Sequence, residues 1–209
     1  MFNSTFHQWL TNPYFDKETR AELEKIIDNQ KEIEERFYRD LEFGTGGLRG
    51  IIGAGTNRMN KYLIRQATQG LASYISTFGA EAKNRGVAIA YDSRHFSQEF
   101  AVEAALVLTA NGIKAYAFEG LRPTPELSFA VRELRAIAGI VITASHNPPQ
   151  YNGYKVYWED GGQIPPERAT VILSCIEAIK DITSVYPMDL ELAKERGLFI
   201  KIGEEMDRK

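Results

Sequence analysis

The sequence contains a single cysteine, Cys175, among its 209 residues, and this scarcity excludes two classes of protein. A disulfide framework and a cysteine-based zinc site both need several cysteines. An excess of positive charge is also lacking, because 25 lysines and arginines face 28 aspartates and glutamates, for a net charge of −3. Since nucleic-acid binding generally requires a strongly basic surface, we expect no nucleic-acid partner.

Long apolar runs are missing as well. The most apolar stretches, residues 101–110 and 137–144, are far shorter than the ~20 residues that cross a bilayer. The first residues contain no basic segment followed by the apolar run that a signal peptide needs. We therefore expect a cytoplasmic protein with no membrane partner.

The hydrophobic content of 44% is that of an ordinary folded chain, and its pattern alternates between strands and helices. Helices are expected between residues 61 and 86 and at residues 98–110, 125–135 and 165–180, with Ser97 and Thr124 as N-caps. Short apolar runs predict strands at residues 87–91, 113–118, 136–143, 154–158 and 198–202. This alternation is typical of an α/β fold, a three-layer α/β/α domain with a mostly parallel mixed sheet. Ligands of such sheets bind outside the carboxyl ends of the strands.

The segment before these strands is expected to be one helix followed by a turn. Apolar residues from Leu23 to Leu41 have helical spacing, and Asp16 is a suitable N-cap. Four glycines within residues 44–50 cannot sustain a helix. They match neither the dinucleotide fingerprint nor the P-loop, so we expect a tight turn that an anion can approach closely.

Ser145 lies in a polar loop that follows the predicted strand at residues 136–143. The prolines of Thr-Ala-Ser-His-Asn-Pro-Pro, residues 143–149, stiffen this loop and would hold the serine on a rigid, exposed turn. Acyl transfer would need glycines on both sides of the serine, which are absent, so a serine hydrolase is disfavoured. Phosphoryl transfer fits better, because Arg49, Arg94 and Lys155 could neutralise phosphate oxygens. A turn-forming serine without chemistry stays open.

The motifs Thr-Ala-Ser-His-Asn-Pro, residues 143–148, and Tyr-Asn-Gly-Tyr-Lys, residues 151–155, resemble the phosphoserine loop of the α-D-phosphohexomutases. Two further motifs agree with this family in order and spacing, those at residues 43–50 and 91–94. The segment Gly-Ala-Gly-Thr-Asn-Arg-Met-Asn, residues 53–60, is most similar to the longer phosphoglucomutases of the family.

This resemblance implies interconversion of glucose 1-phosphate and glucose 6-phosphate through a phosphoserine enzyme. Ser145 would exchange its phosphate with the hexose phosphate substrate by way of a bisphosphorylated sugar, with glucose 1,6-bisphosphate as activator. The implied cofactor is Mg²⁺, bound to Ser145 through its phosphate. Lys155 would be a proton shuttle, Arg49 a clamp on the phosphoserine and His146 an orienting catalytic residue. The residues implied in substrate and phosphate binding are Gly47, Arg94, Asn147 and Thr143.

The sequence departs from the family in its length and its aspartates. Family members have four domains and hold magnesium in an aspartate-rich loop, whereas no Asp-x-Asp pattern occurs here. We therefore expect residues 1–190 to be the phosphoserine domain and residues 191–209 to begin a connection into a second domain, so that the chain alone is inactive. An edge strand with a frayed terminus is the simpler interpretation of residues 198–209. The other functions left open are a phosphomannomutase, a phosphopentomutase and a stand-alone sugar-phosphate-binding module.

Overall fold

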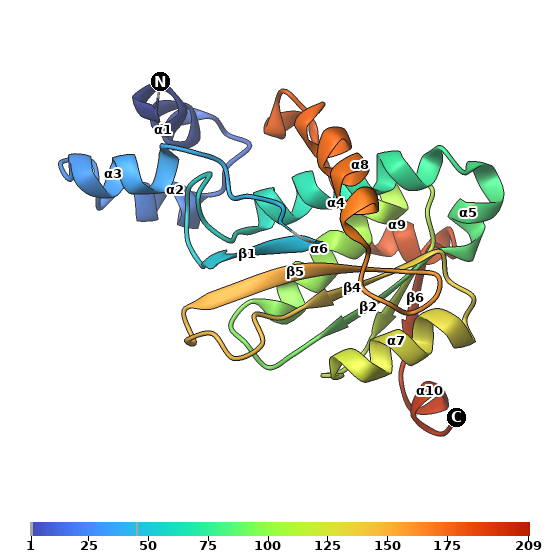
Figure 1. Cartoon of the computed structure of the whole chain (residues 1–209). Coiled ribbons are helices and arrows are strands. Elements are labelled where there is room, and N and C mark those ends of the chain that lie inside the picture. Colours follow the sequence, from blue (N-terminus) through green and yellow to red (C-terminus); the bar gives the residue numbers. More distant parts are fainter. Residues whose placement is uncertain (1, 45) are drawn as a thin grey trace.

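A six-stranded sheet forms the centre of the computed structural model, which describes residues 2–44 and 46–209 (Figure 1). The strand order is β1-β5-β4-β2-β3-β6. Strands β4, β2, β3 and β6 run parallel to one another, whereas β5 is antiparallel to both β4 and β1. The bounds are β1 (Gly47–Ile51), β2 (Val87–Tyr91), β3 (Ala115–Phe118), β4 (Ala138–Ile142), β5 (Tyr151–Trp158) and β6 (Phe199–Ile202).

Helices cover both faces of this sheet, which confirms the predicted three-layer α/β/α architecture with a mostly parallel mixed sheet (Figure 1). Helices α4 (Lys61–Ser76), α6 (Ser97–Ala110) and α8 (Pro166–Glu177) pack on one face. Helix α7 (Thr124–Glu133) packs on the other. Shorter helices lie at the periphery: α5 (Gly79–Arg85), η1 (Ile182–Ser184), α9 (Leu190–Glu195) and α10 (Glu204–Asp207).

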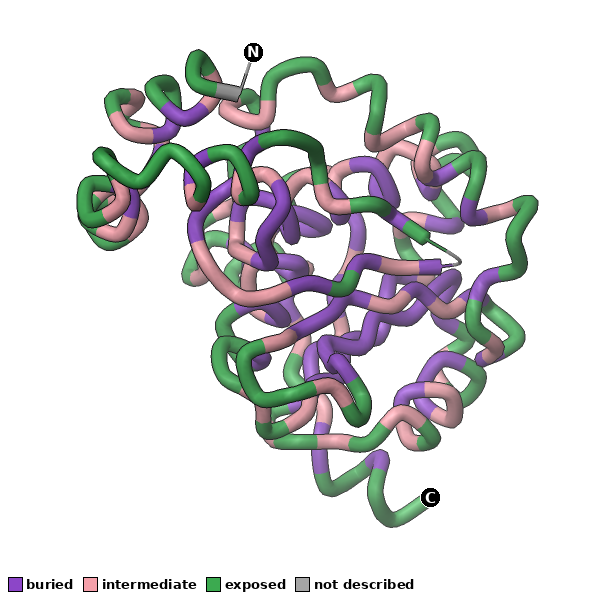
Figure 2. Tube along the Cα trace, turned by 60° about the vertical axis from the view of Figure 1, so that its left-hand side comes forward, coloured by how far each residue is buried: buried purple, intermediate pink, exposed green. Residues whose placement is uncertain are grey.

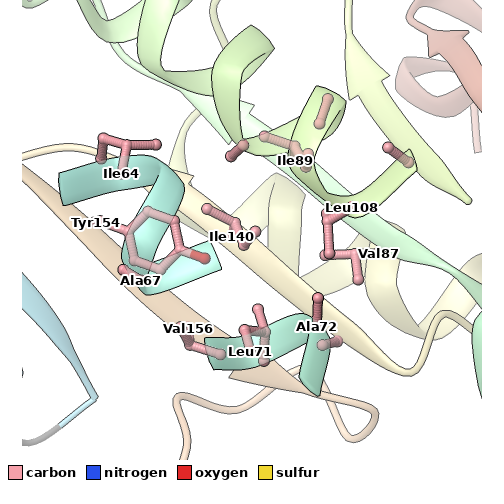
Figure 3. Packing of buried hydrophobic residues seen from close by; sticks show 14 of the residues in the cluster. Ile64, Ala67, Leu71, Ala72, Val87, Ile89, Leu108, Ile140, Tyr154 and Val156 are labelled. Atoms are coloured by element: carbon pink, nitrogen blue, oxygen red, sulfur yellow. The ribbon is translucent and has the colours of Figure 1, made fainter. Parts of the chain in front are cut away.

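The core lies between the central strands and helices α4 and α6 (Figure 3). Ile89 of β2 and Ile140 of β4 contribute from the sheet, while Leu71 and Leu108 contribute from the two helices, and all four side chains are fully buried. Full burial of each such side chain is worth roughly 1.5–3 kcal/mol. Figure 2 shows the buried residues gathered in the interior and the exposed ones on the outside. The loops at the carboxyl ends of β2 and β4 therefore begin at strands that are held in place by the core.

The N-terminal part is a helical layer of its own, and here the sequence prediction was wrong in detail. Helices α1 (Phe2–Thr11), α2 (Lys17–Glu24) and α3 (Gln30–Phe37) replace the single expected helix. The chain leaves helical form after α2, Ile27 is half exposed, and Asn29 starts α3 by accepting a hydrogen bond from the backbone of Glu32. The Asp16 N-cap is confirmed, because its carboxylate accepts from Thr19 N at 2.8 Å. The three helices enclose an aromatic cluster around Trp9 and Phe37.

Strand β1 was not predicted. Its glycines indicated a turn, yet Gly47 pairs with Lys155 of β5. A Cβ atom at position 47 would lie 2.0 Å from the carbonyl oxygen of Tyr154. Glycine is therefore needed here for close approach of two strands, which a local sequence pattern does not reveal.

The expected N-caps of α6 and α7 were also wrong. Ser97 is the first residue of α6, and Phe96 occupies the N-cap position with a φ of 63°. The Ser97 hydroxyl donates instead to the carboxylate of Asp92. Helix α7 begins at Thr124, and Pro123 takes the extended conformation of the N-cap residue. A proline at the second helical position fits the first turn, so the helix forms without a side-chain cap.

The last residues extend the sheet. Strand β6 pairs parallel with β3, and α10 follows it. The expectation that residues 191–209 begin a connection into a second domain stays a prediction. None of the helices formed by residues 2–44 and 46–209 combines the length and the apolar character that crossing a membrane requires.

Candidate active site

The candidate site lies where β2 and β4, neighbours in the sheet, reach their carboxyl ends. The loop after β2 and the loop after β4 meet around a cavity of about 310 Å³. This is the place where parallel α/β sheets bind ligands, as expected from the sequence. The cavity is lined by Asp92, Ser93, Arg94, His95, Ser145, Asn147 and Pro149.

Ser145 stands at the tip of the loop after β4, exposed to solvent, with a left-handed backbone (φ 55°). Its backbone N–H donates to the Thr143 hydroxyl at 2.9 Å, and Asn147 N donates to Ala144 O at 3.1 Å. A left-handed conformation costs a residue other than glycine about 1–2 kcal/mol, so the surrounding contacts must hold it. The loop presents the serine hydroxyl outward rather than using it as a backbone cap.

Lys155 contacts this hydroxyl directly. It lies on β5, and its Nζ donates to Ser145 Oγ at 2.7 Å. Partial burial, followed by the positive charge of Arg49, lowers the pKa of Lys155. A lysine that becomes neutral more easily is better able to accept a proton from the serine. The structure thus brings together two residues that the sequence assigned to catalysis.

Arg49 and Gly47 come from β1, the edge strand beside β5. Arg49 is paired with Gly153 and Gly47 with Lys155, and residues two apart on a strand share a face. The exposed Arg49 side chain therefore lies on the same face of the sheet as Lys155. Arg49 is near enough to Lys155 for its positive charge to lower the pKa of that lysine, and its role as a clamp on a phosphoserine stays a prediction.

Arg94 lies in the loop after β2, lines the cavity and contacts the serine loop. Its Nη2 donates to the carbonyl oxygens of Ser145 (2.7 Å) and Asn147 (2.6 Å), and its Nη1 to those of Pro148 (2.9 Å) and Tyr151 (3.1 Å). The guanidinium thus binds the backbone of the serine loop. Its role in binding a substrate phosphate stays a prediction.

Two side chains that the sequence analysis did not single out hold the loop after β2 in place. Asp92 Oδ1 accepts from the backbone N–H of Arg94 at 3.0 Å and from the Ser97 hydroxyl at 2.8 Å. The fully buried Asn152 donates from Nδ2 to His95 O at 2.9 Å and to Ser97 Oγ at 3.0 Å. Asp92 belongs to the motif at residues 91–94, Tyr-Asp-Ser-Arg, and Asn152 belongs to the motif at residues 151–155. Membership in these motifs is the signal in the sequence that could have found them.

The remaining expected residues also lie at the loop. The His146 side chain is exposed next to Ser145, and Thr143 is buried beneath it. Asn147 Oδ1 is buried without a hydrogen-bond partner among the described residues. Roles in phosphate binding for these residues stay predictions.

The described part of the chain does not form a complete magnesium site. Over residues 2–44 and 46–209, no group of three or more histidine, cysteine, aspartate or glutamate side chains is arranged to hold a metal. Asp92 lines the cavity, but its oxygens are engaged with Ser97 and lie near Arg94. Since Mg²⁺ favours six oxygen ligands in octahedral geometry, the donors present do not fit it by themselves.

Comparison with known proteins identifies the class that this fold and site define. The family model for the α/β/α domain I of phosphoglucomutase/phosphomannomutase matches residues 40–183. The phosphoglucomutase of Staphylococcus aureus strain MRSA252 is 42% identical over 181 residues, which are 86% of this chain and 32% of that relative. The corresponding protein of strain USA300 is 40% identical over the same length. The chain therefore belongs to the phosphoglucomutase/phosphomannomutase family, and it spans about a third of the length of these relatives.

Solved structures agree with this assignment. A protein from Thermus thermophilus, provisionally named a phosphomannomutase, has a TM-score of 0.64 and 28% identity over 79% of this chain and 33% of its own. Parafusin, a phosphoglucomutase from Paramecium, has a TM-score of 0.56 and 22% identity, covering 75% of this chain and 29% of its own. The second likeness shows the fold alone.

Proposed function

We propose that this chain is the phosphoserine domain of a phosphoglucomutase, which interconverts glucose 1-phosphate and glucose 6-phosphate. The observation that carries the proposal is the contact of Lys155 Nζ with Ser145 Oγ at 2.7 Å, on an exposed tip held in a left-handed conformation. The curated relatives at about 40% identity are phosphoglucomutases, which supports glucose as the sugar.

The chemistry is a pair of phosphoryl transfers. Ser145 Oγ attacks one phosphorus of a bisphosphorylated hexose, its proton passes to neutral Lys155, and the bond between that phosphorus and the sugar oxygen breaks. The leaving sugar oxygen takes up a proton and becomes a hydroxyl. In the second transfer, the free C1 or C6 hydroxyl of a glucose monophosphate attacks the phosphorus of the phosphoserine, and the bond between that phosphorus and Ser145 Oγ breaks. Protonated Lys155 returns its proton to Ser145 Oγ, and the proton of the attacking hydroxyl passes to solvent. The protein mainly supplies positioning and charge for such a step.

The charges around Ser145 suit this cycle. A phosphoserine carries about −1.5 to −2 charges and three acceptor oxygens. Lys155, once protonated, and Arg49 would balance this charge from the same face of the sheet. His146 and Asn147 flank the phosphate-bearing residue and would orient its oxygens.

Sugar recognition would come from other parts of the polypeptide, since the relatives are about three times longer than the matched region. The family's requirement for Mg²⁺ would be met by one oxygen of the Ser145 phosphate together with ligands from outside this chain. Glucose 1,6-bisphosphate would load the serine. On this basis the chain alone should not turn over glucose 1-phosphate, and the working location would be the cytoplasm.

The test is uptake of phosphate by Ser145 in the complete natural polypeptide. Incubation with glucose 1,6-bisphosphate should add one phosphate by intact mass, and peptide mapping should place it on Ser145. Ser145→Ala should abolish the gain, whereas Ser93→Ala, a change at another serine lining the same cavity, should not. Phosphate that persists in Ser145→Ala would overturn the proposal.

The choice of sugar can be tested in the same way. Mannose 1,6-bisphosphate and ribose 1,5-bisphosphate should load the serine more slowly than the glucose compound. Faster loading by either would favour a phosphomannomutase or a phosphopentomutase.

A further inference from the structure

Arg94 connects the loop after β2 to the serine loop, which lies between β4 and β5, and to the first residue of β5. All of its donors are directed to protein oxygens: Nη1 and Nη2 bind four carbonyl groups, and Nε lies 3.5 Å from Asp92 Oδ2. The side chain is 14% exposed. A guanidinium has five N–H groups and no acceptor, and the four on Nη1 and Nη2 are all used, so these four cannot bind a substrate phosphate unless a contact with a carbonyl group breaks.

The four carbonyl groups belong to residues 145, 147, 148 and 151, and they converge on a single cation. Carbonyl dipoles that point at one place repel each other unless a positive charge lies among them. One of these carbonyls is that of Ser145 itself, whose left-handed backbone needs external support. The contact with Arg94 therefore bears directly on the residue that presents the hydroxyl.

We infer that Arg94 is a positioning residue: it holds the serine loop in the conformation that brings Ser145 Oγ to Lys155, and it does not bind the substrate phosphate. The kinetic part of this inference rests on the proposed phosphoserine function, but the conformational part does not.

Asp92 and the residues that hold it also fix the orientation of Arg94. Asp92 accepts from the Arg94 backbone N–H through Oδ1 and lies near Nε through Oδ2. Asp92 is held in turn by Ser97, which accepts from the buried Asn152. The guanidinium is thus locked between a rigid network and the loop it supports.

The substitution Arg94→Lys distinguishes binding of a substrate phosphate from positioning of the serine loop. Lysine is a good phosphate ligand as a point charge, but its single ammonium has three donors on a flexible stem and cannot reproduce the planar fork. If Arg94 bound phosphate, Arg94→Lys would keep much of the function. If it holds the loop, Arg94→Lys should behave like Arg94→Gln.

The matched control is Arg85→Lys. Arg85 also donates to backbone carbonyls, those of Arg135 and Ala136, and it forms an ion pair with Glu159. It precedes β2 and therefore lies at the opposite end of the strand from Arg94. Its substitution removes a similar set of contacts far from the serine loop.

The first measurement is amide hydrogen exchange of the 209-residue chain without ligand. The backbone N–H groups of Ser145 and Asn147 should exchange at least about tenfold faster in Arg94→Lys and Arg94→Gln, because one or more charge-assisted hydrogen bonds are lost. Core amides of β2 should stay unchanged, which separates local loosening from global destabilisation. Arg85→Lys should leave the loop amides as they are in the unsubstituted protein.

The second measurement is the rate of Ser145 phosphorylation by glucose 1,6-bisphosphate in the complete polypeptide. At saturating donor, Arg94→Lys should be at least about tenfold slower, while the donor concentration for half-saturation changes little. Asp92→Asn keeps Arg94 and weakens only its support, so it should give a smaller change at the same amides. This graded response keeps the inference testable if the Arg94 variants do not fold.

Several results would overturn the inference. Unchanged loop exchange in Arg94→Lys, a raised half-saturation concentration with an unchanged maximal rate, or faster exchange throughout the core would each do so. If the loop amides respond as expected but the unsubstituted protein takes up no phosphate, the proposed function fails while the loop-holding role stands.

Discussion

Substitution of Gly47 tests how closely β1 lies against β5, the strand that carries Lys155. Replacing it by alanine puts a carbon atom 2.0 Å from the Tyr154 carbonyl oxygen and 2.9 Å from the Lys155 Cα. Ordinary contact begins at about 3.4 Å, so β1 and β5 must separate by roughly 1.4 Å at this point. Both obstructing groups are backbone atoms of the neighbouring strand and cannot turn aside as a flexible side chain could.

The cost follows from two effects. Overpacking of this kind costs about 1–3 kcal/mol, and a separation of roughly 1.4 Å also breaks an adjacent ladder hydrogen bond, worth about 1 kcal/mol. The hydrogen bond from Val156 N to Gly46 O, at 2.9 Å, is the nearest in this position. We expect Gly47→Ala to lower the free energy of unfolding by about 2–4 kcal/mol, which lowers the melting temperature by roughly 4–16 °C for a chain of this size.

The assay is urea unfolding of the chain, with Gly44→Ala as the control. The nearest atom to a Cβ at position 44 is 4.0 Å away, and Gly44 has no positive φ. Alanine there should leave stability unchanged or raise it by about 0.4–1 kcal/mol through the unfolded state. Both substitutions replace a glycine by an alanine, and they differ only in their position. Equal stability of Gly47→Ala and Gly44→Ala would refute the close approach of β1 to β5.

Two further predictions concern pH. Since burial, followed by Arg49, lowers the pKa of Lys155, its neutral form gains population as the pH rises, and Ser145 phosphorylation should accelerate with pH below the ordinary lysine pKa of 10.5. Lys155→Met should be slow with a flat profile, and a persisting slope would contradict this role. Burial raises the pKa of Asp16, but hydrogen bonds from Lys61 and Thr19 outweigh it and lower the pKa to about 2. Because this value lies below the ordinary 3.8, the carboxylate stabilises the fold above about pH 4 and this stability is lost as the pH falls through about 2. Urea midpoints of Asp16→Asn should therefore fall less with acid than those of the unsubstituted protein, and an equal fall would disprove the assignment.

Strands β2 and β4, whose carboxyl ends meet at the cavity, could be predicted because every one of their residues is buried. Strand β2 is buried at every position and reads as a continuous apolar run. Strand β1 could not be predicted, because Gly47 and Gly50 weaken any local strand signal, and Gly47 is required only by backbone atoms of Tyr154 and Lys155, which are distant in sequence. The break between α2 and α3 was missed for a related reason: Ile27 fits the helical spacing but is half exposed.

The same limit applies to the site. Arg94 and Lys155 are both cationic residues next to the serine loop, and residue type alone predicted that both neutralise phosphate oxygens. The structure separates them, because Arg94 directs its donors to the loop backbone, whereas the Lys155 ammonium contacts the Ser145 hydroxyl. One positive charge contacts the backbone of the loop, and the other contacts the hydroxyl that the proposed function makes the phosphate acceptor. These contacts all lie within residues 92–155, so in the proposed reaction this part of the chain would set the geometry of the phosphate-accepting serine. Other parts of the polypeptide would then have to supply the sugar and the metal, but not the geometry of the serine.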